Sequence, residues 1–205
     1  MTKEEILQEV AVQLYADLLA VAQEYTCPCI MLTNRTSFAG TDTTANTITM
    51  LLYFLSSNPP AYIRLRKEID GATAAGLLSK PMKDSEIRQM PYMQACIREA
   101  LRLMPPLQST HFYKAAPPGG DIVCGYHVPH GARVATNSTM YTIGRLESFW
   151  GDDAEEFRPE RWFETDEGRR QAMLTRTDLV FGHGQFACVG KVIAWMEISK
   201  TVAEV

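Results

Sequence analysis

The sequence contains no apolar run long enough to cross a membrane as a helix, which takes about 20 residues. The most apolar stretch, residues 48–55, is short and includes Thr49, so it predicts a core helix. The N-terminal residues, from Thr2 to Glu5, are polar and lack the character of a signal peptide. We therefore expect an intracellular protein with no membrane span in this chain.

Cysteines are few and follow no repeated spacing. There are five, an odd number, at Cys27, Cys29, Cys96, Cys124 and Cys188. This pattern predicts reduced thiols rather than a disulfide framework. A structural zinc site at Cys27-Pro28-Cys29 is disfavoured, because a second pair of ligands is missing.

The sequence also lacks a strong excess of charge. The formal net charge is −4, with 21% charged and 46% hydrophobic residues. These values exclude a disordered chain and give no reason to expect nucleic-acid binding. The length suits one domain, residues 1–205, and no internal repeat or low-complexity linker divides it.

Helical periodicity dominates what the sequence does contain. Apolar residues at helical spacing predict helices over residues 1–14, 37–57, 91–104 and 191–205. Residues 122–128 and 132–135 predict the two strands of a hairpin, with its turn at Pro129-His130-Gly131. The predicted fold class is therefore mainly α with a small β-hairpin or sheet.

Residues 181–190 (Phe-Gly-His-Gly-Gln-Phe-Ala-Cys-Val-Gly) place one cysteine, Cys188, in a glycine-rich loop directly before a helix. Glycine allows turns and close approaches that other residues resist. A helix N-terminus favours the thiolate, which is the form that binds metals. The plainer alternative is a buried structural cysteine beside a turn.

Residues 39–44 (Ala-Gly-Thr-Asp-Thr-Thr) fall inside the helix predicted for residues 37–57. Glycine weakens a helix by about 1 kcal/mol relative to alanine, and clustered Thr and Asp compete for backbone hydrogen bonds, so we expect a kink. Gly40 leaves room for a ligand, and Asp42 and Thr43 supply an acid beside a hydroxyl. The alternative is a Thr-rich helix start with Asp42 as its cap.

Two further segments carry charge in apolar surroundings. Glu99 and Arg102 are three residues apart, so they can pair on one helical face. An exposed ion pair of little energetic weight is the alternative. Residues 157–163 (Phe-Arg-Pro-Glu-Arg-Trp-Phe) combine a rigid proline, the charged Arg161 and a large ring. Here the alternative is a surface loop pinned by Trp162.

Together these segments resemble the signature motifs of the cytochrome P-450 family, the haem-thiolate monooxygenases. The motifs occur in the family's order. The residues at 183–185 (His-Gly-Gln) and 159–162 (Pro-Glu-Arg-Trp) are most similar to those of fungal microsomal members. The resemblance runs from about Phe38 to Val205. It implies the C-terminal half of the family's fold, from the long central helix to the helix after the haem-ligand loop.

The resemblance implies a haem cofactor whose iron binds the thiolate of Cys188. It places Phe181, Gly184 and Gly190 in the loop that contacts the cofactor. Lys114, just before the predicted hairpin, is a candidate for contact with a haem propionate. A solvated loop lysine is an equally good interpretation of Lys114.

The remaining motifs take roles by the same resemblance. Gly40 and Thr43 would face the bound oxygen, with Asp42 feeding protons. Glu99, Arg102 and Arg161 would form a structural triad behind the haem. Electrons would come from NADPH through a separate reductase, and the substrate would be a small apolar molecule. The family implies fungal secondary metabolism or detoxification and, for a full-length protein, the endoplasmic reticulum membrane.

Three departures from the family pattern qualify these expectations. Phe186 stands where many members carry Arg or His for a propionate. Residues 15–37 interrupt a helix that the family keeps continuous, which predicts an aberrant insertion such as a retained intron. We also expect the chain to be a partial domain without the family's N-terminal half. Two alternatives to the monooxygenase therefore remain, an inactive haem-binding or interaction fragment and a haem-thiolate hydroperoxide isomerase.

Overall fold

The computed structural model describes residues 30–107, 113–135, 139–184 and 187–204. The helices are α2 (Ile30–Ser57), α3 (Pro59–Ala74), α4 (Asp84–Ile87), α5 (Pro91–Leu103), α6 (Thr139–Gly144), α7 (Glu147–Trp150), α8 (Glu167–Asp178) and α9 (Lys191–Glu204), with 3-10 turns η1 (Pro159–Trp162) and η2 (Leu179–Phe181). The strands are β1 (Tyr113–Ala115), β2 (Asp121–Val123), β3 (Tyr126–Val128) and β4 (Arg133–Ala135). The predicted mainly α class with a small β part is confirmed.

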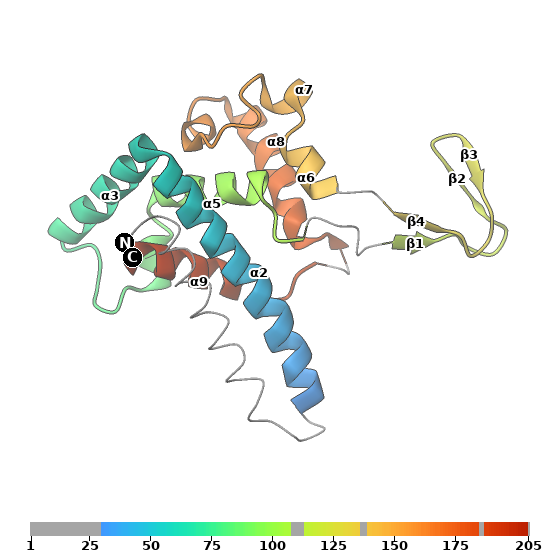
Figure 1. Cartoon of the computed structure of the whole chain (residues 1–205), viewed down its shortest axis with the longest axis horizontal. Helices are drawn as coiled ribbons and strands as arrows, with labels where there is room; N and C mark the ends of the chain where they lie inside the picture. The colour runs from blue at the N-terminus through green and yellow to red at the C-terminus, as the bar shows by residue number, and fades with distance from the viewer. Residues whose placement is uncertain (1–29, 108–112, 136–138, 185–186, 205) are drawn as a thin grey trace.

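Helix α2 is the long rod that runs diagonally through Figure 1. It begins at Ile30, earlier than the predicted start near Ser37, because neither proline nor glycine interrupts the sequence between them. The assigned helix continues without interruption through Gly40. In the part of the chain that the structure describes, no helix is long and apolar enough to span a bilayer. The helix predicted for residues 1–14 lies outside the described residues, as do Cys27 and Cys29.

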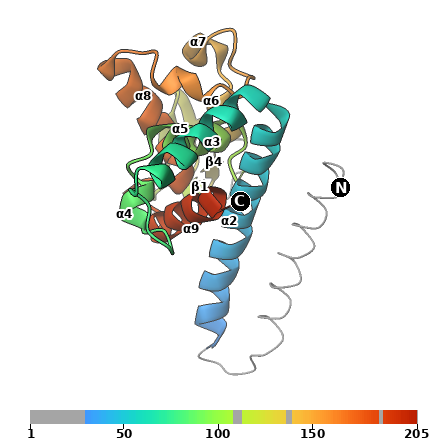
Figure 2. The same cartoon turned by 90° about the vertical axis from the view of Figure 1, so that its left-hand side faces the viewer.

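Helix α5 forms the centre of the structure. Helices α2, α3 and α9 and the turn η1 all pack against it (Figures 1 and 2). The core between them contains fully buried apolar side chains, among them Leu51, Met93, Ile97, Leu103 and Ile198. Burying such side chains stabilises the fold by about 1.5–3 kcal/mol each. The charged residues of α5 are therefore carried on the best-packed element of the chain.

The first turn of α5 is held by a carboxylate from another helix. Oxygens Oε1 and Oε2 of Glu68, on α3, accept hydrogen bonds from the backbone amides of Tyr92 and Met93, each at 2.9 Å. The first amides of a helix have no partner within the helix, and a negative group there also favours the helix dipole. Glu68 thus fixes α3 against the start of α5.

The β region differs from the predicted hairpin in its strand pairing and has an additional turn. The turn lies at Cys124-Gly125, where both residues have positive φ (51° and 85°), so β2 and β3 pair with each other. Strand β4 returns to β1 instead, with Lys114 opposite Val134. A two-residue loop with positive φ matches the twist of a tight hairpin, which explains why β2 and β3 pair across it. The predicted turn at residues 129–131 is present, closed by the bond from the Ala132 amide to the Pro129 carbonyl at 3.1 Å, but it leads β4 back to β1. Both small sheets project away from the helices (Figure 1).

Candidate functional site

The loop that carries Cys188 is closed by its own backbone. Turn η2 ends at Phe181, and positive φ angles at Gly182 (74°) and Gly184 (59°) reverse the chain. The Cys188 amide then donates to the Phe181 carbonyl at 2.7 Å, and the Ala187 amide donates to the Gly184 carbonyl at 3.1 Å. The loop therefore has a defined shape around its cysteine.

Cys188 lies just before α9 and presents an exposed, free thiol. A Cβ at Gly190 would lie 3.8 Å from the Cys188 sulfur, so Gly190 is directly beside it. Val189, Val192 and Ile193 are exposed as well, although all three are apolar. The alternative of a buried structural cysteine is wrong, because Cys188 is exposed, as are these apolar neighbours in the chain.

Phe181 anchors the loop from the side of the core. Its ring packs at 6.1 Å from that of Trp195 on α9, and the Lys191 ammonium lies 5.2 Å from the ring centroid. Lys191 also pairs with Asp178 at 2.9 Å, where α8 ends. These contacts join the two ends of the loop. Gln185 and Phe186 lie outside the described residues.

Cys188 offers a single sulfur donor at the surface of the loop. Within the described ranges no group of three or more His, Cys, Asp or Glu side chains is arranged to hold a metal ion. A lone thiolate suits a metal whose other ligands come from its own cofactor, as the iron of haem does. The exposed apolar side chains beside Cys188 also suit a flat apolar ring. The residues present therefore fit a haem.

On α2 the Thr43 hydroxyl donates to a backbone carbonyl and not to the neighbouring Asp42 carboxylate. Thr43 donates its hydroxyl proton to the Ala39 carbonyl at 2.8 Å, and Thr47 likewise donates to the Thr43 carbonyl at 2.9 Å. Bonds of this kind let threonine remain inside a helix. Asp42 is exposed, and the space where a Cβ at Gly40 would lie has no atom within 4 Å. Gly40 and Asp42 thus lie on an open face of α2, whereas Thr44 at the end of the motif is buried.

Lys114 lies on β1, in the part that projects from the helices. Its side chain is 84% exposed and its ammonium is 3.8 Å from an Asp121 carboxylate oxygen. This is the environment of a solvated lysine, the alternative that the sequence leaves open for it.

Glu99, Arg102 and Arg161 meet in the core. Nε and Nη2 of Arg102 donate to the two carboxylate oxygens of Glu99 at 3.0 and 2.8 Å, and Nε of Arg161 donates to Glu99 at 2.8 Å. The side chains of Glu99 and Arg102 have no exposed surface, and that of Arg161 is 4% exposed. The alternative of an exposed pair is therefore wrong.

Further hydrogen bonds offset the cost of burying these charges. The Glu99 carboxylate also accepts from the Trp162 indole at 3.1 Å and from the Arg158 amide at 3.1 Å. Arg102 also donates to the carbonyls of Gly144, Ala154 and Glu156. A buried ion pair is tolerated only when its remaining donors and acceptors are satisfied in this way.

Asp153 is a member of this cluster that the sequence did not indicate. Its carboxylate accepts from Arg161 at 3.1 Å and from Arg158 at 2.6 Å. Burial alone would raise the pKa of Asp153, but the two arginines outweigh burial and hold the pKa below its usual range. No spacing rule joins Asp153 to Glu99, because the link runs through Arg161.

Gly144, at the end of α6, must remain without a side chain. A Cβ there would lie 2.0 Å from the Arg102 carbonyl oxygen. We expect Gly144→Ala to destabilise the protein by about 1–3 kcal/mol, because α6 must move from the buried arginine. Urea unfolding measures this free energy. Gly71→Ala is the matched control, since its Cβ would meet no atom within 4 Å. It should raise stability by about 0.5–1 kcal/mol, and equal effects of the two variants would contradict the prediction.

Cys96 gives α5 a pH-dependent stability. Burial raises the pKa of the Cys96 thiol well above its usual value. In the unfolded chain the thiol ionises near pH 8.5, whereas the folded protein keeps it neutral. The stability that the neutral Cys96 thiol contributes is therefore fully present below about pH 8.5. As the pH rises further, the free energy of unfolding falls by up to ~1.4 kcal/mol per pH unit. Urea unfolding between pH 8.5 and 9.5 should show this slope, and Cys96→Ala should reduce it. An unchanged slope in the variant would contradict the assignment.

Comparison with known proteins gives a consistent family. A model of the cytochrome P-450 family matches residues 30–205. Cytochrome P-450 monooxygenase ABA1 of Pyricularia oryzae is 42% identical over 167 residues, covering 81% of this chain and 32% of that protein. Cytochrome P-450 monooxygenase cicH of Emericella nidulans is 39% identical (82% and 33% covered), and pisatin demethylase of Fusarium vanettenii is 37% identical (82% and 31% covered). The chain spans about a third of the length of these curated relatives.

Proposed function

Since the chain belongs to the cytochrome P-450 family, we propose that it provides the haem-ligand part of a monooxygenase, with the Cys188 thiolate bound to the iron. One observation carries the proposal. The Cys188 thiol is free and exposed at the start of α9, in a loop closed by the bond from its amide to the Phe181 carbonyl. Gly190 keeps the space beside the sulfur open, and Gly184 supports the turn.

When bound, the haem supplies the oxidation chemistry, and a thiolate ligand favours cleavage of the O–O bond. The protein's own residues position and protect this group. Phe181 and Gly184 hold the loop so that the Cys188 sulfur keeps its direction. Lys114 remains a candidate for a propionate. Glu99, Arg102 and Arg161 keep α5 and η1 in a fixed relation behind the loop.

Asp42 and Thr43 are proposed to move protons toward the oxygen site. Asp42 is exposed, so its carboxylate can exchange protons with solvent. The Thr43 hydroxyl donates a hydrogen bond to the Ala39 carbonyl. After rotation about the Cα–Cβ bond, this hydroxyl can pass on a proton. Gly40 leaves open space next to these two side chains.

The substrate and partners are proposed at the level of chemical class. One relative is named pisatin demethylase, and the family implies a small apolar substrate. We accordingly assign a small apolar substrate and a role in fungal secondary metabolism or detoxification. A reductase using NADPH would supply the electrons, and the full-length protein would lie at the endoplasmic reticulum membrane.

Residues 15–37 are proposed to be an aberrant insertion in a partial P-450 domain. The described part of this stretch, from Ile30 onward, is helical and continuous with α2. Sequencing transcripts across codons 14 to 38 tests the idea. Transcripts in which codon 14 joins codon 38 are expected, whereas a transcript pool that uniformly keeps the segment would overturn it.

The carbon monoxide spectrum of the reduced, haem-loaded chain tests the proposed function. A thiolate-type shift of the Soret band is expected, and its absence would leave the interpretation of an inactive fragment. Product formation that depends on NADPH and reductase then identifies a monooxygenase. Turnover of a hydroperoxide without reductase would identify an isomerase instead.

A further inference from the structure

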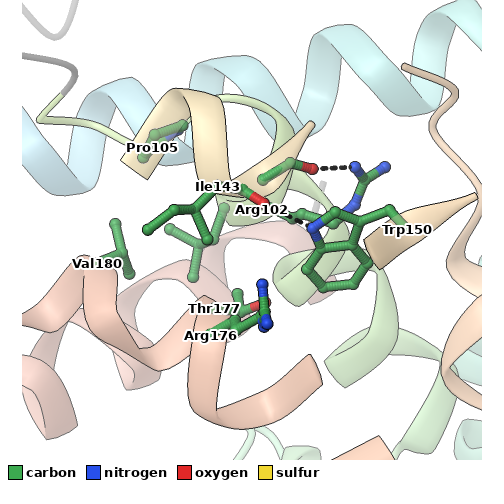
Figure 3. A pocket seen from close by; sticks show the side chains of 9 residues that line it. Arg102, Pro105, Ile143, Trp150, Arg176, Thr177 and Val180 are labelled. Atoms are coloured by element: carbon green, nitrogen blue, oxygen red, sulfur yellow. Dashed lines mark hydrogen bonds between the residues drawn. The ribbon is translucent and has the colours of Figure 1, made fainter. Parts of the chain in front are cut away.

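A small cavity lies where the C-terminal end of α5 meets α6, α7 and α8. Its walls include Leu101, Pro105, Ile143, Trp150, Thr177 and Val180. Figure 3 shows Thr177 and Val180 on one side and Pro105, Ile143 and Trp150 around the rest. The cavity measures about 10 Å³, counted as the space open to the centre of a water molecule. That is room for one water molecule and for no larger ligand.

One wall of the cavity holds a buried hydroxyl without a partner. Thr177, on α8, is 7% exposed. Its Oγ1 has no hydrogen-bond partner among the residues that the structure describes. Native proteins pair nearly all such groups, often with an ordered water. The hydroxyl therefore indicates a polar occupant of the cavity.

The end of α5 offers a backbone acceptor to the same cavity. In an α-helix the carbonyl of Leu101 would accept from the amide of residue 105, but residue 105 is proline and has no N–H. Helix α5 ends at Leu103, so the Leu101 carbonyl belongs to its last turn. Leu101, Pro105 and Thr177 all line the same cavity.

We propose that one buried water molecule binds here, donating to the Leu101 carbonyl and sharing a hydrogen bond with the Thr177 hydroxyl. The water joins the end of α5 to α8. Helix α8 leads through η2 to Phe181, whose carbonyl holds the Cys188 amide. The bridge therefore ties the helix of Glu99 and Arg102 to the segment before the cysteine loop.

Replacing Thr177 by the isosteric valine distinguishes a bridged hydroxyl from an unpaired one. If the water is bound, Thr177→Val loses a hydrogen bond, and the haem-loaded full chain should melt about 2–4 °C lower. If the hydroxyl is unpaired, the same change removes a buried polar group and should leave the Tm equal or higher. The latter result would overturn the proposal.

Thr175→Val is the matched control. Thr175 is on the same helix, is exposed, and donates its hydroxyl to the Gln171 carbonyl at 2.9 Å. Its replacement should leave the Tm within about 1 °C. If the Tm of Thr175→Val falls as far as that of Thr177→Val, valine has a general cost in α8, and this result would count against the water bridge.

A crystal structure of the unmutated protein tests the site even if Thr177→Val does not fold. We expect one ordered water within about 2.7–3.2 Å of both Thr177 Oγ1 and the Leu101 carbonyl oxygen. A dry cavity, or a Thr177 hydroxyl bonded directly to a protein carbonyl, would overturn the proposal.

Discussion

The haem-loaded Cys188→Ser variant should lose the thiolate-type Soret shift in its reduced carbon monoxide spectrum. A serine hydroxyl keeps its proton near neutral pH and is a poor donor to haem iron, whereas a cysteine thiolate is a strong one. The replacement should not disturb the fold, because the Cys188 side chain is exposed and the bond from residue 188 to the Phe181 carbonyl uses the backbone. The expected effect is therefore complete loss of one spectral signature in a folded protein.

Cys124→Ser provides the matched control for this experiment. Cys124 is also exposed and free, but it lies in the tight turn between β2 and β3. This variant should keep the full Soret shift. Persistence of the shift in Cys188→Ser would show that another group is the axial ligand. Loss of the shift in both variants would point to a general effect on haem loading.

Local chemistry made the cysteine loop predictable from the sequence. Gly182 and Gly184 adopt the positive φ angles that glycine tolerates, and the helix after Gly190 begins as its periodicity predicts. The pair of Glu99 and Arg102 follows from helical spacing in the same way. Each of these features depends on residues close together in the chain.

The partners of the buried cluster could not be found by spacing. The Trp162 indole reaches Glu99 across 63 positions, and the Arg102 guanidinium reaches the Ala154 carbonyl across 52. Only the resemblance to a family suggested that Arg161 belongs with Glu99. Asp153 was missed, because a carboxylate in a loop has many possible partners and no periodicity selects one.

The prediction of the strand pairing was wrong for a different reason. The turn predicted at residues 129–131 is present, but the sequence did not predict the second turn, where Cys124 adopts a positive φ that is uncommon for its type. Gly125 supplies the second residue of the turn at no steric cost. A non-glycine residue in a left-handed conformation gives little signal in a single sequence, so register was the least predictable part of the fold.

Glu99→Gln should destabilise the protein by about 3–5 kcal/mol, the largest loss expected from a single substitution on α5. The glutamine has nearly the same shape but carries no charge. Arg102 and Arg161 would then remain buried with no carboxylate between them. The amide NH₂ of the glutamine is itself a donor, so it cannot accept the hydrogen bonds that a carboxylate oxygen of Glu99 accepts. Urea unfolding measures the difference in free energy.

Asp70→Asn is the control that separates burial from charge. Asp70 pairs with Arg66 at 3.6 Å, and both side chains are more than 60% exposed. Losing an exposed pair of this kind should cost less than about 0.5 kcal/mol. If Glu99→Gln does not fold, Arg161→Lys tests the same cluster more gently, because lysine keeps the charge and loses the fork of donors. A cost below about 1 kcal/mol for Glu99→Gln would mean that solvent reaches the cluster, and its role in holding α5 to η1 would have to be abandoned.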